Sequence, residues 1–142
     1  MNREELIRII KDINVPVHGL VSLSRLAKEI IDNKYFQRLR RMKQLGICEY
    51  VFPSAKHSRF EHSIGTYKLA GILLTRIYNV TDNRLLLEWI NNNKILGEIK
   101  EEGILWVFEL IKIAGLCHDL GHGPFSHMFD DCFVDKQVGS IF

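Results

Sequence analysis

The stretch IAGLCHDLGHGPFSHMFD, residues 113–130, joins an apolar segment to a cluster of histidines, aspartates, glycines and a proline. The sequence from Ile104 is apolar on nearly every side until Lys112, a pattern that predicts a central, buried helix. His118 and Asp119 would be buried together at its end, which is costly unless a partner binds both. A divalent cation does so, because imidazole nitrogen and carboxylate oxygen are both metal ligands. Three interpretations of the cluster remain open: a metal site, a hydrolytic active site, or simply the polar end of a helix.

Other histidines favour the first two interpretations. His62 falls in the first turn of a predicted long helix and is the candidate ligand from a second element. His122 stands between two glycines, which presents it on a loop, and Pro124 fits the first turn of a new helix. Within that helix His127 and Asp130 are three residues apart and share a face. A single histidine is usually a hydrogen-bonded core residue, so only the group as a whole indicates a site.

The remaining pattern predicts helices, and the expected fold class is all-α. Apolar residues at positions 6, 9, 10 and 13 predict a helix over residues 3–13, which Pro16 and Gly19 end. Aromatic and β-branched residues followed by a proline admit a small hairpin near residues 48–56. Further helices are expected at 22–33, 35–45, 59–78 and 83–103, the last as one or two helices.

Length and composition indicate one ordinary globular domain. The chain has 142 residues, of which 46% are hydrophobic and 25% are charged. Its three cysteines form no CxxC pair, which excludes a disulfide framework and a zinc knuckle as expectations. The N-terminus is not a signal peptide, and no apolar run approaches the roughly 18 residues of a membrane span. We therefore expect an intracellular protein, cytoplasmic or nuclear, that is neither secreted nor in a membrane.

A basic run, KYFQRLRRMK at residues 34–43, contains no acidic residue. A helix with such a face suits polyanions, either nucleotides or single-stranded nucleic acid. The alternative is a solvated helix face without a partner. We expect His18 and His57 to be surface or local hydrogen-bonding residues.

Two motifs, HSRFEHSIGTYKLA at residues 57–70 and the stretch at 113–130, resemble the HD-domain metal-dependent phosphohydrolases. The match is closest to the SAM-and-HD-domain deoxynucleoside triphosphate triphosphohydrolases, and it runs from about Lys11 to Asp130. The resemblance implies an HD-domain-like helical bundle that is incomplete at its C-terminal side. Residues 1–142 would be the N-terminal portion of a single HD domain, without a SAM domain.

The resemblance also implies a metal centre and its chemistry. His62, His118 and Asp119 match three of the four ligands of a divalent metal, which would be Mg, Mn, Fe or Zn. Residues near the phosphates and the attacking water would be catalytic, and their matches are His122, His127 and Asp130.

Two further groups of positions match nucleotide contacts. Substrate-binding positions match Arg59, Gln44 and Leu45. Positions that bind an activating nucleotide, GTP or a dNTP, between subunits match Lys11, Asn14, Asp32, Gln37 and Arg40.

The sequence departs from the family pattern downstream of the motif. The fourth ligand, an aspartate on a distant helix, has no counterpart in the 23 residues after Asp119, and Lys136 stands where the family has a catalytic histidine. One hypothesis is dNTP hydrolysis, with the missing ligand supplied by a partner chain or by water. The others are a non-catalytic nucleotide or nucleic-acid binding module and an inactive remnant. We expect exposed apolar surface and either a homo-oligomer or association with a longer homologue.

Overall fold

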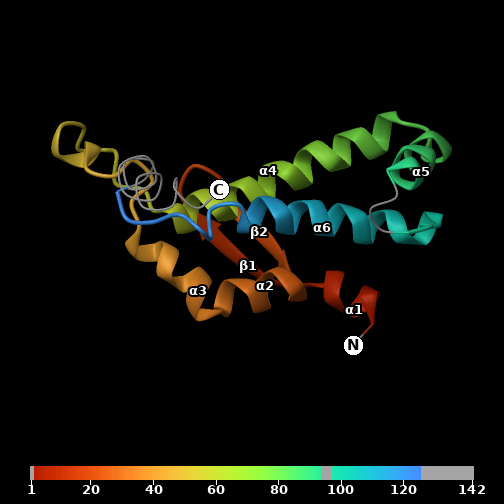
Figure 1. The fold of residues 1–142 in the computed structure, drawn as a ribbon, viewed down its shortest axis with the longest axis horizontal. Coiled ribbons are helices and arrows are strands. Elements are labelled where there is room, and N and C mark those ends of the chain that lie inside the picture. Colours follow the sequence, from red (N-terminus) through yellow and green to blue (C-terminus); the bar gives the residue numbers. More distant parts are fainter. Residues whose placement is uncertain (1, 94–96, 126–142) are drawn as a thin grey trace, which may run out of the picture.

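Two long helices, α4 (Arg59–Val80) and α6 (Ile104–Cys117), lie side by side and run in opposite directions (Figure 1). The structure is a computed structural model that describes residues 2–93 and 97–125. Because the two helices are antiparallel, the first turn of α4 meets the end of α6. The predicted helix over 59–78 is confirmed, and α6 provides the expected helix before His118.

The N-terminal segment folds as a β-hairpin, where the apolar spacing predicted a helix over 3–13. Helix α1 (Arg3–Ile7) covers only the first turn, and β1 (Ile9–Val15) then pairs antiparallel with β2 (Gly19–Ser24). Gly19 has a φ of +64°, which lets the chain reverse tightly after the turn at Pro16. The β-branched side chains of β1 favour a strand once β2 is available as a partner. The chain is thus mostly helical with a small two-stranded sheet, and the all-α prediction omitted the sheet.

The next two predicted helices are shorter in the structure. Ser24 caps α2 (Arg25–Asp32) by accepting a hydrogen bond from the backbone N–H of Ala27 at 3.0 Å, so the preceding residues remain in β2. The predicted helix over 35–45 is split into α3 (Lys34–Gln37) and the 3₁₀ turn η1 (Arg38–Arg41).

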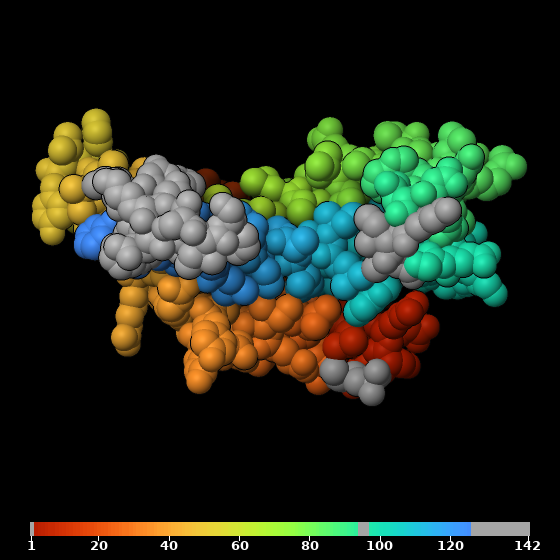
Figure 2. All heavy atoms as spheres, viewed as in Figure 1, coloured from red at the N-terminus to blue at the C-terminus, as the bar shows by residue number. Residues whose placement is uncertain are grey.

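Residues 44–57 form a projecting loop, and the hairpin predicted near 48–56 is wrong. The loop contains the 3₁₀ turn η2 (Cys48–Tyr50) followed by turns, and within the described residues it forms no strand pair of its own. An isolated antiparallel bridge between Lys43 and Ser58 closes its base. Figure 2 shows the loop extending beyond the rest of the surface, coloured yellow.

Two apolar clusters fill the interior. The first lies between the hairpin, α2, α3 and the start of α4, and the second lies at the far end of α4. Helices α5 (Asn83–Asn92) and α6 and the 3₁₀ turn η3 (Glu101–Gly103) enclose the second cluster. Several large apolar side chains of α4 and α6 are exposed, among them Leu69, Leu73 and Leu105. No helix in the described ranges is long and apolar enough to cross a membrane.

The turn of the hairpin rests directly on α4. His18 packs so closely against Gly65 that a Cβ added there would lie 2.2 Å from His18 Nε2. Such a distance is far below van der Waals contact, so the ring of His18 occupies space that only a glycine leaves open. Since Gly65 is one turn after His62, the hairpin turn is held beside the histidine cluster.

Gly65→Ala is expected to destabilise the fold by about 1–3 kcal/mol through overpacking against His18. The sign of the change in unfolding free energy is informative, because alanine is otherwise favoured over glycine inside a helix by about 1 kcal/mol. Gly71→Ala is the matched control on the same helix: its nearest neighbour would be Lys112 Cε at 3.4 Å, at the end of a flexible side chain. Urea unfolding of both variants provides the measurement. A stabilised Gly65→Ala protein would contradict the contact, and adding His18→Ala should relieve the strain.

Candidate metal centre

Three side chains converge where α4 meets the end of α6. His62 comes from the first turn of α4, His118 is the residue that ends α6, and Asp119 follows it. Each offers one potential ligand atom, and these atoms lie within 4.8 Å of one another. The two histidine Nε2 atoms are 3.1 Å apart, and His118 Nε2 is 3.1 Å from Asp119 Oδ1. The structure therefore brings together the three residues proposed as ligands from the sequence.

The hydrogen bonding of His118 prepares it for a cation. Its Nδ1 lies 2.7 Å from the carbonyl oxygen of Gly115, which can only accept, so Nδ1 carries the proton and donates. In the neutral ring Nε2 is then an unprotonated acceptor that faces the Asp119 carboxylate. Two acceptors repel each other unless a cation lies between them. A ring nitrogen fixed by a backbone carbonyl is the usual arrangement of metal-binding histidines, so the donor set fits a divalent metal.

Burial keeps His62 in the form that a metal needs. Its pKa lies below the ordinary histidine value, chiefly because burial penalises the charged ring, although nearby Asp119 acts in the opposite direction. His62 is thus neutral at pH 7, and only a neutral imidazole has a lone pair to donate.

Asp119 is held by a buried ion pair with Arg59. Arg59 NH1 lies 2.7 Å from Asp119 Oδ2, and the two side chains are only 1% and 5% exposed. The backbone N–H of Arg59 also donates to the Met42 carbonyl at 2.8 Å, which anchors the start of α4. Oδ1 of Asp119 remains directed toward His118 and toward His122, whose Nε2 is 3.6 Å away. Here Arg59 contacts a candidate metal ligand, and its predicted contact with a substrate phosphate stays a prediction.

The loop that carries His122 is fixed by Arg38, a residue whose role the sequence did not reveal. Arg38 NH2 donates to the carbonyl oxygens of Leu120 and His122, at 2.5 and 3.1 Å. The sequence showed Arg38 only as one member of the basic run. The periodicity of a helix cannot distinguish an arginine that binds carbonyls 82 residues away from one that faces solvent.

The predicted substrate residues Gln44 and Leu45 lie in the turn beside this loop. Gln44 is partly buried, and Leu45 is 48% exposed. The next residue, Gly46, has a φ of +59°, and a Cβ on it would be 3.5 Å from the backbone oxygen of Phe125. His127 and Asp130, the other predicted catalytic residues, lie outside the described residues, as does Lys136.

Two of the five predicted activator-binding residues, Gln37 and Arg40, are hydrogen-bonded to each other. Lys11 and Lys28 both lower the pKa of Asp32, Lys28 through a hydrogen bond that has the larger effect. Arg40 Nε donates to Gln37 Oε1 at 2.7 Å, and Gln37 Nε2 donates to the Ile31 carbonyl beside Asp32. Asn14 is exposed on β1 and makes no side-chain hydrogen bond to another described residue. Within the described residues, a hydrogen bond therefore joins Gln37 to Arg40, while Lys11 acts on Asp32 through its charge alone, and Asn14 is linked to neither pair.

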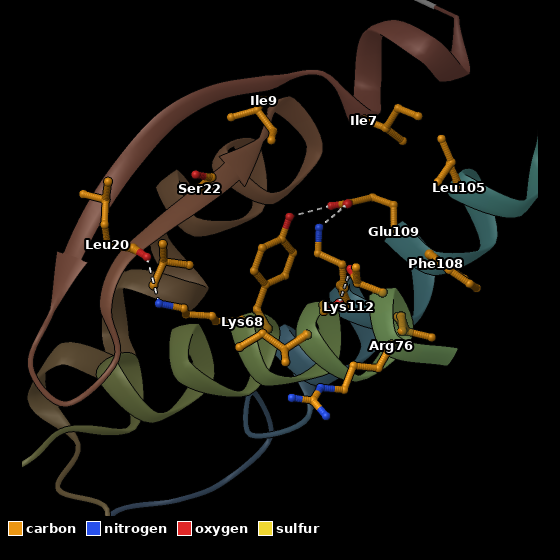
Figure 3. A pocket seen from close by; sticks show the side chains of 16 residues that line it. Ile7, Ile9, Leu20, Ser22, Lys68, Arg76, Leu105, Phe108, Glu109 and Lys112 are labelled. Carbon is orange, nitrogen blue, oxygen red and sulfur yellow. Dashed lines mark hydrogen bonds and ion pairs between the residues drawn. The ribbon is translucent and has the colours of Figure 1, made fainter. Parts of the chain in front are cut away.

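A pocket of about 610 Å³ lies away from the histidine cluster, between the hairpin, α4 and α6 (Figure 3). Buried Glu109 accepts hydrogen bonds there from Ser24 at 2.6 Å, Tyr67 at 2.9 Å and Lys112 at 2.7 Å. Burial alone would lower the pKa of Lys112, but its bonds to Glu109 and Tyr67 raise it overall. The polar groups of this network satisfy one another, so it ties α6 to α4 and β2 and leaves the histidine cluster as the candidate functional site.

Comparison with known proteins gives close relatives. No protein-family model matches the chain. It is 47% identical over 119 residues to HD domain-containing protein L394 of Acanthamoeba polyphaga mimivirus, covering 83% of this chain and 25% of that protein. It is 50% identical over 124 residues to deoxynucleoside triphosphate triphosphohydrolase SAMHD1 of Bos taurus, covering 87% and 18%. The SAMHD1 homolog of Dictyostelium discoideum is 45% identical over 130 residues, covering 92% and 22%. The chain thus spans a quarter or less of the length of these relatives.

Removing one partner of the Arg59–Asp119 pair is expected to cost about 3–5 kcal/mol, since it leaves an uncompensated buried charge. Asp119→Ala and Arg59→Met should each show this loss in urea unfolding. The double variant should lose clearly less than the sum, because neither charge is then stranded. Additive losses, within about 0.5 kcal/mol, would show that the two side chains are not coupled.

Mn²⁺ is expected to bind the purified protein at one site and to raise its melting temperature as the free metal concentration exceeds the dissociation constant. His118→Gln should abolish this binding with little loss of stability, because the side chain is 40% exposed. His57→Gln, a histidine outside the cluster, is the matched control and should bind as the wild type does. Isothermal titration calorimetry measures all three proteins. Undiminished binding to His118→Gln would exclude the cluster as the metal site.

Proposed function

This chain is related to the HD-domain proteins over most of its length, and from that premise we propose that it is a metal-dependent phosphohydrolase acting on deoxynucleoside triphosphates. The proposed reaction takes a dNTP and water to a deoxynucleoside and inorganic triphosphate. The observation that carries it is the convergence of His62, His118 and Asp119, with His118 Nδ1 directed at the Gly115 carbonyl and its Nε2 directed at the other two candidate ligands. Relatives named deoxynucleoside triphosphate triphosphohydrolases support the choice of substrate.

The proposed roles follow from the positions of the side chains. A divalent metal, when bound by the cluster, supplies Lewis-acid activation of a phosphate group. Arg59 holds the Asp119 carboxylate in one orientation, so the ligand set is formed before substrate arrives. His122 is 25% exposed beside Asp119, where it can exchange a proton with a reacting group. We assign His127 and Asp130 to the same proton transfer from their motif positions.

The reaction balances without a further reagent. Water adds to the α-phosphorus, and the bond from that phosphorus to the deoxyribose 5′ oxygen breaks. The leaving oxygen takes up a proton, and triphosphate departs with the oxygen that came from water. Among the described residues, His122 is placed to deliver this proton to the leaving oxygen. Gln44 and Leu45 would contact the nucleoside.

Association with another chain is part of the proposal. Three protein ligands leave coordination positions that a partner chain or water can fill. Exposed apolar side chains on α4 and α6, Leu69, Leu73 and Leu105, provide surface for a homo-oligomer or for a longer homologue.

A second candidate function is nucleotide binding without catalysis. The Gln37–Arg40 hydrogen bond and the effect of the Lys11 charge on Asp32 favour it, because two cations, an amide and a carboxylate can bind the phosphates and base of GTP. GTP binding that survives His118→Gln but not Arg40→Gln would identify this function and separate it from hydrolysis.

A product assay tests the main proposal. The chain is incubated with each dNTP, with and without GTP, under Mg²⁺, Mn²⁺ or Fe²⁺, and deoxynucleoside and triphosphate are separated by chromatography. We expect both products in equal amounts, and a loss of at least about 100-fold for His118→Gln. Arg84→Gln, on α5 and far from the cluster, is the control and should keep full activity. Folded, metal-loaded protein that yields neither product would contradict the proposal for this chain.

A further inference from the structure

The turn that follows α6 carries two groups that are supported to different degrees. Asp119 is fixed by its buried ion pair with Arg59, at 2.7 Å. His122 lies three residues further on, between Gly121 and Gly123, and glycine has the most conformationally permissive backbone of all residues. The backbone N–H of His122 donates to the Asp119 carbonyl oxygen at 3.3 Å, which is a long hydrogen bond. The turn alone thus gives His122 weak support.

Arg38 supplies further support from a distant part of the chain. Its NH2 group donates to two carbonyl oxygens, those of Leu120 and His122, at 2.5 and 3.1 Å. These two carbonyls flank Gly121, so one guanidinium group spans a glycine of the turn. Hydrogen bonds from a charged donor are stronger than those between neutral groups. The guanidinium group therefore restrains the turn at the residue whose backbone is least restricted by its own side chain.

The segment that presents Arg38 is itself firmly packed. On either side of Arg38, the side chains of Phe36 and Leu39 are 1% and 0% exposed and belong to the first apolar cluster. The ring of Phe36 packs edge-on against that of Phe60, with 5.6 Å between the ring centroids. Phe60 lies in the first turn of α4. Arg38 thus reaches the turn after α6 from a base that is fastened to the start of α4.

We propose that Arg38 is a positioning residue, which holds His122 where it can deliver a proton to the leaving oxygen. The proton transfer rests on the proposed function, whereas the restraint of the turn by Arg38 does not. None of the roles that the family resemblance implies falls on Arg38. Among the described residues, its side chain makes no hydrogen bond to the side chain of a candidate metal ligand. Loss of Arg38 should therefore affect proton transfer and leave metal binding intact.

Hydrogen exchange of a peptide that covers residues 118–125 measures the restraint directly, without metal or substrate. We expect Arg38→Gln to speed this exchange about fivefold or more, because the turn opens more often once its two carbonyls lose their donor. Arg41→Gln is the matched control and should exchange as the wild type does. Arg41 is an exposed arginine of the same 3₁₀ turn, and its side chain makes no hydrogen bond or ion pair with another described residue.

Turnover of a dNTP measures the consequence for catalysis. We expect kcat of Arg38→Gln to fall about tenfold or more, since a displacement of about 1 Å can cost a reaction about 100-fold. KM should stay close to the wild-type value, and Mn²⁺ binding in calorimetry should be unchanged, which also shows that the variant is folded. Arg41→Gln should keep the wild-type kcat.

Gly121 permits a rescue experiment. A Cβ added to Gly121 would meet no described atom within 4 Å, and its φ is not in the left-handed region. An alanine there restricts the backbone without a clash. The variant Arg38→Gln/Gly121→Ala should therefore exchange more slowly than Arg38→Gln and recover part of its kcat. A purely electrostatic role of Arg38 would not respond to this second change.

Three results would overturn the inference. These are unchanged exchange in Arg38→Gln, an equal loss of kcat in Arg41→Gln, and a raised KM at unchanged kcat in Arg38→Gln. The last result would make Arg38 a substrate-binding residue. If the wild-type chain forms no product, the phosphohydrolase proposal fails by itself, and the exchange of the turn still tests the restraint by Arg38.

Discussion

The buried ion pair between Arg59 and Asp119 is the interaction on which the site depends. It joins the first residue of α4 to the second residue beyond α6, so it sets how the ends of two antiparallel helices meet. A buried pair of charges is stable only when its geometry is good and its other atoms have partners. The surrounding histidines are positioned by the same two helix ends. The packing of the two helix ends therefore also sets the positions of the candidate metal ligands.

A second polar tie fixes the register of the helix pair. Glu109 lies ten residues before Asp119 on α6, which corresponds to about 15 Å along a helix. It binds Tyr67 of α4 and Ser24 of the hairpin, while Asp119 binds Arg59 at the start of α4. Apolar contacts alone would allow α6 to shift along α4 by one turn, since neighbouring turns present similar apolar side chains. Two separate buried polar contacts do not, because a shift by one turn would strand both carboxylates.

The long helices followed from sequence patterns, because helical periodicity is a local property. The convergence of His62 with His118 and Asp119 was expected from metal-ligand chemistry and from the family resemblance, since the two histidines are 56 residues apart. The hairpin did not, since the spacing of Leu6, Ile9, Ile10 and Ile13 fits a helix and only pairing with β2 decides for a strand. The partners of Arg59 and Arg38 were not predicted either: Arg59 was expected to contact substrate, and Arg38 was only one member of the basic run. Their partners lie 60 and 82 residues away, and the direction of a long side chain depends on packing that no sequence window contains.

The antiparallel bridge between Lys43 and Ser58 separates the projecting loop at residues 44–57 from the rest of the fold. The backbone N–H of Gln44 donates to the His57 carbonyl at 3.1 Å just inside the bridge, so both ends of the excursion are pinned before Arg59 begins α4. Its tip, where Tyr50 is 84% exposed, contributes nothing to either interior cluster. Insertions and deletions at that tip are therefore expected to be tolerated. A peptide tag or a fluorophore attached there should leave the positions of the candidate metal ligands unchanged.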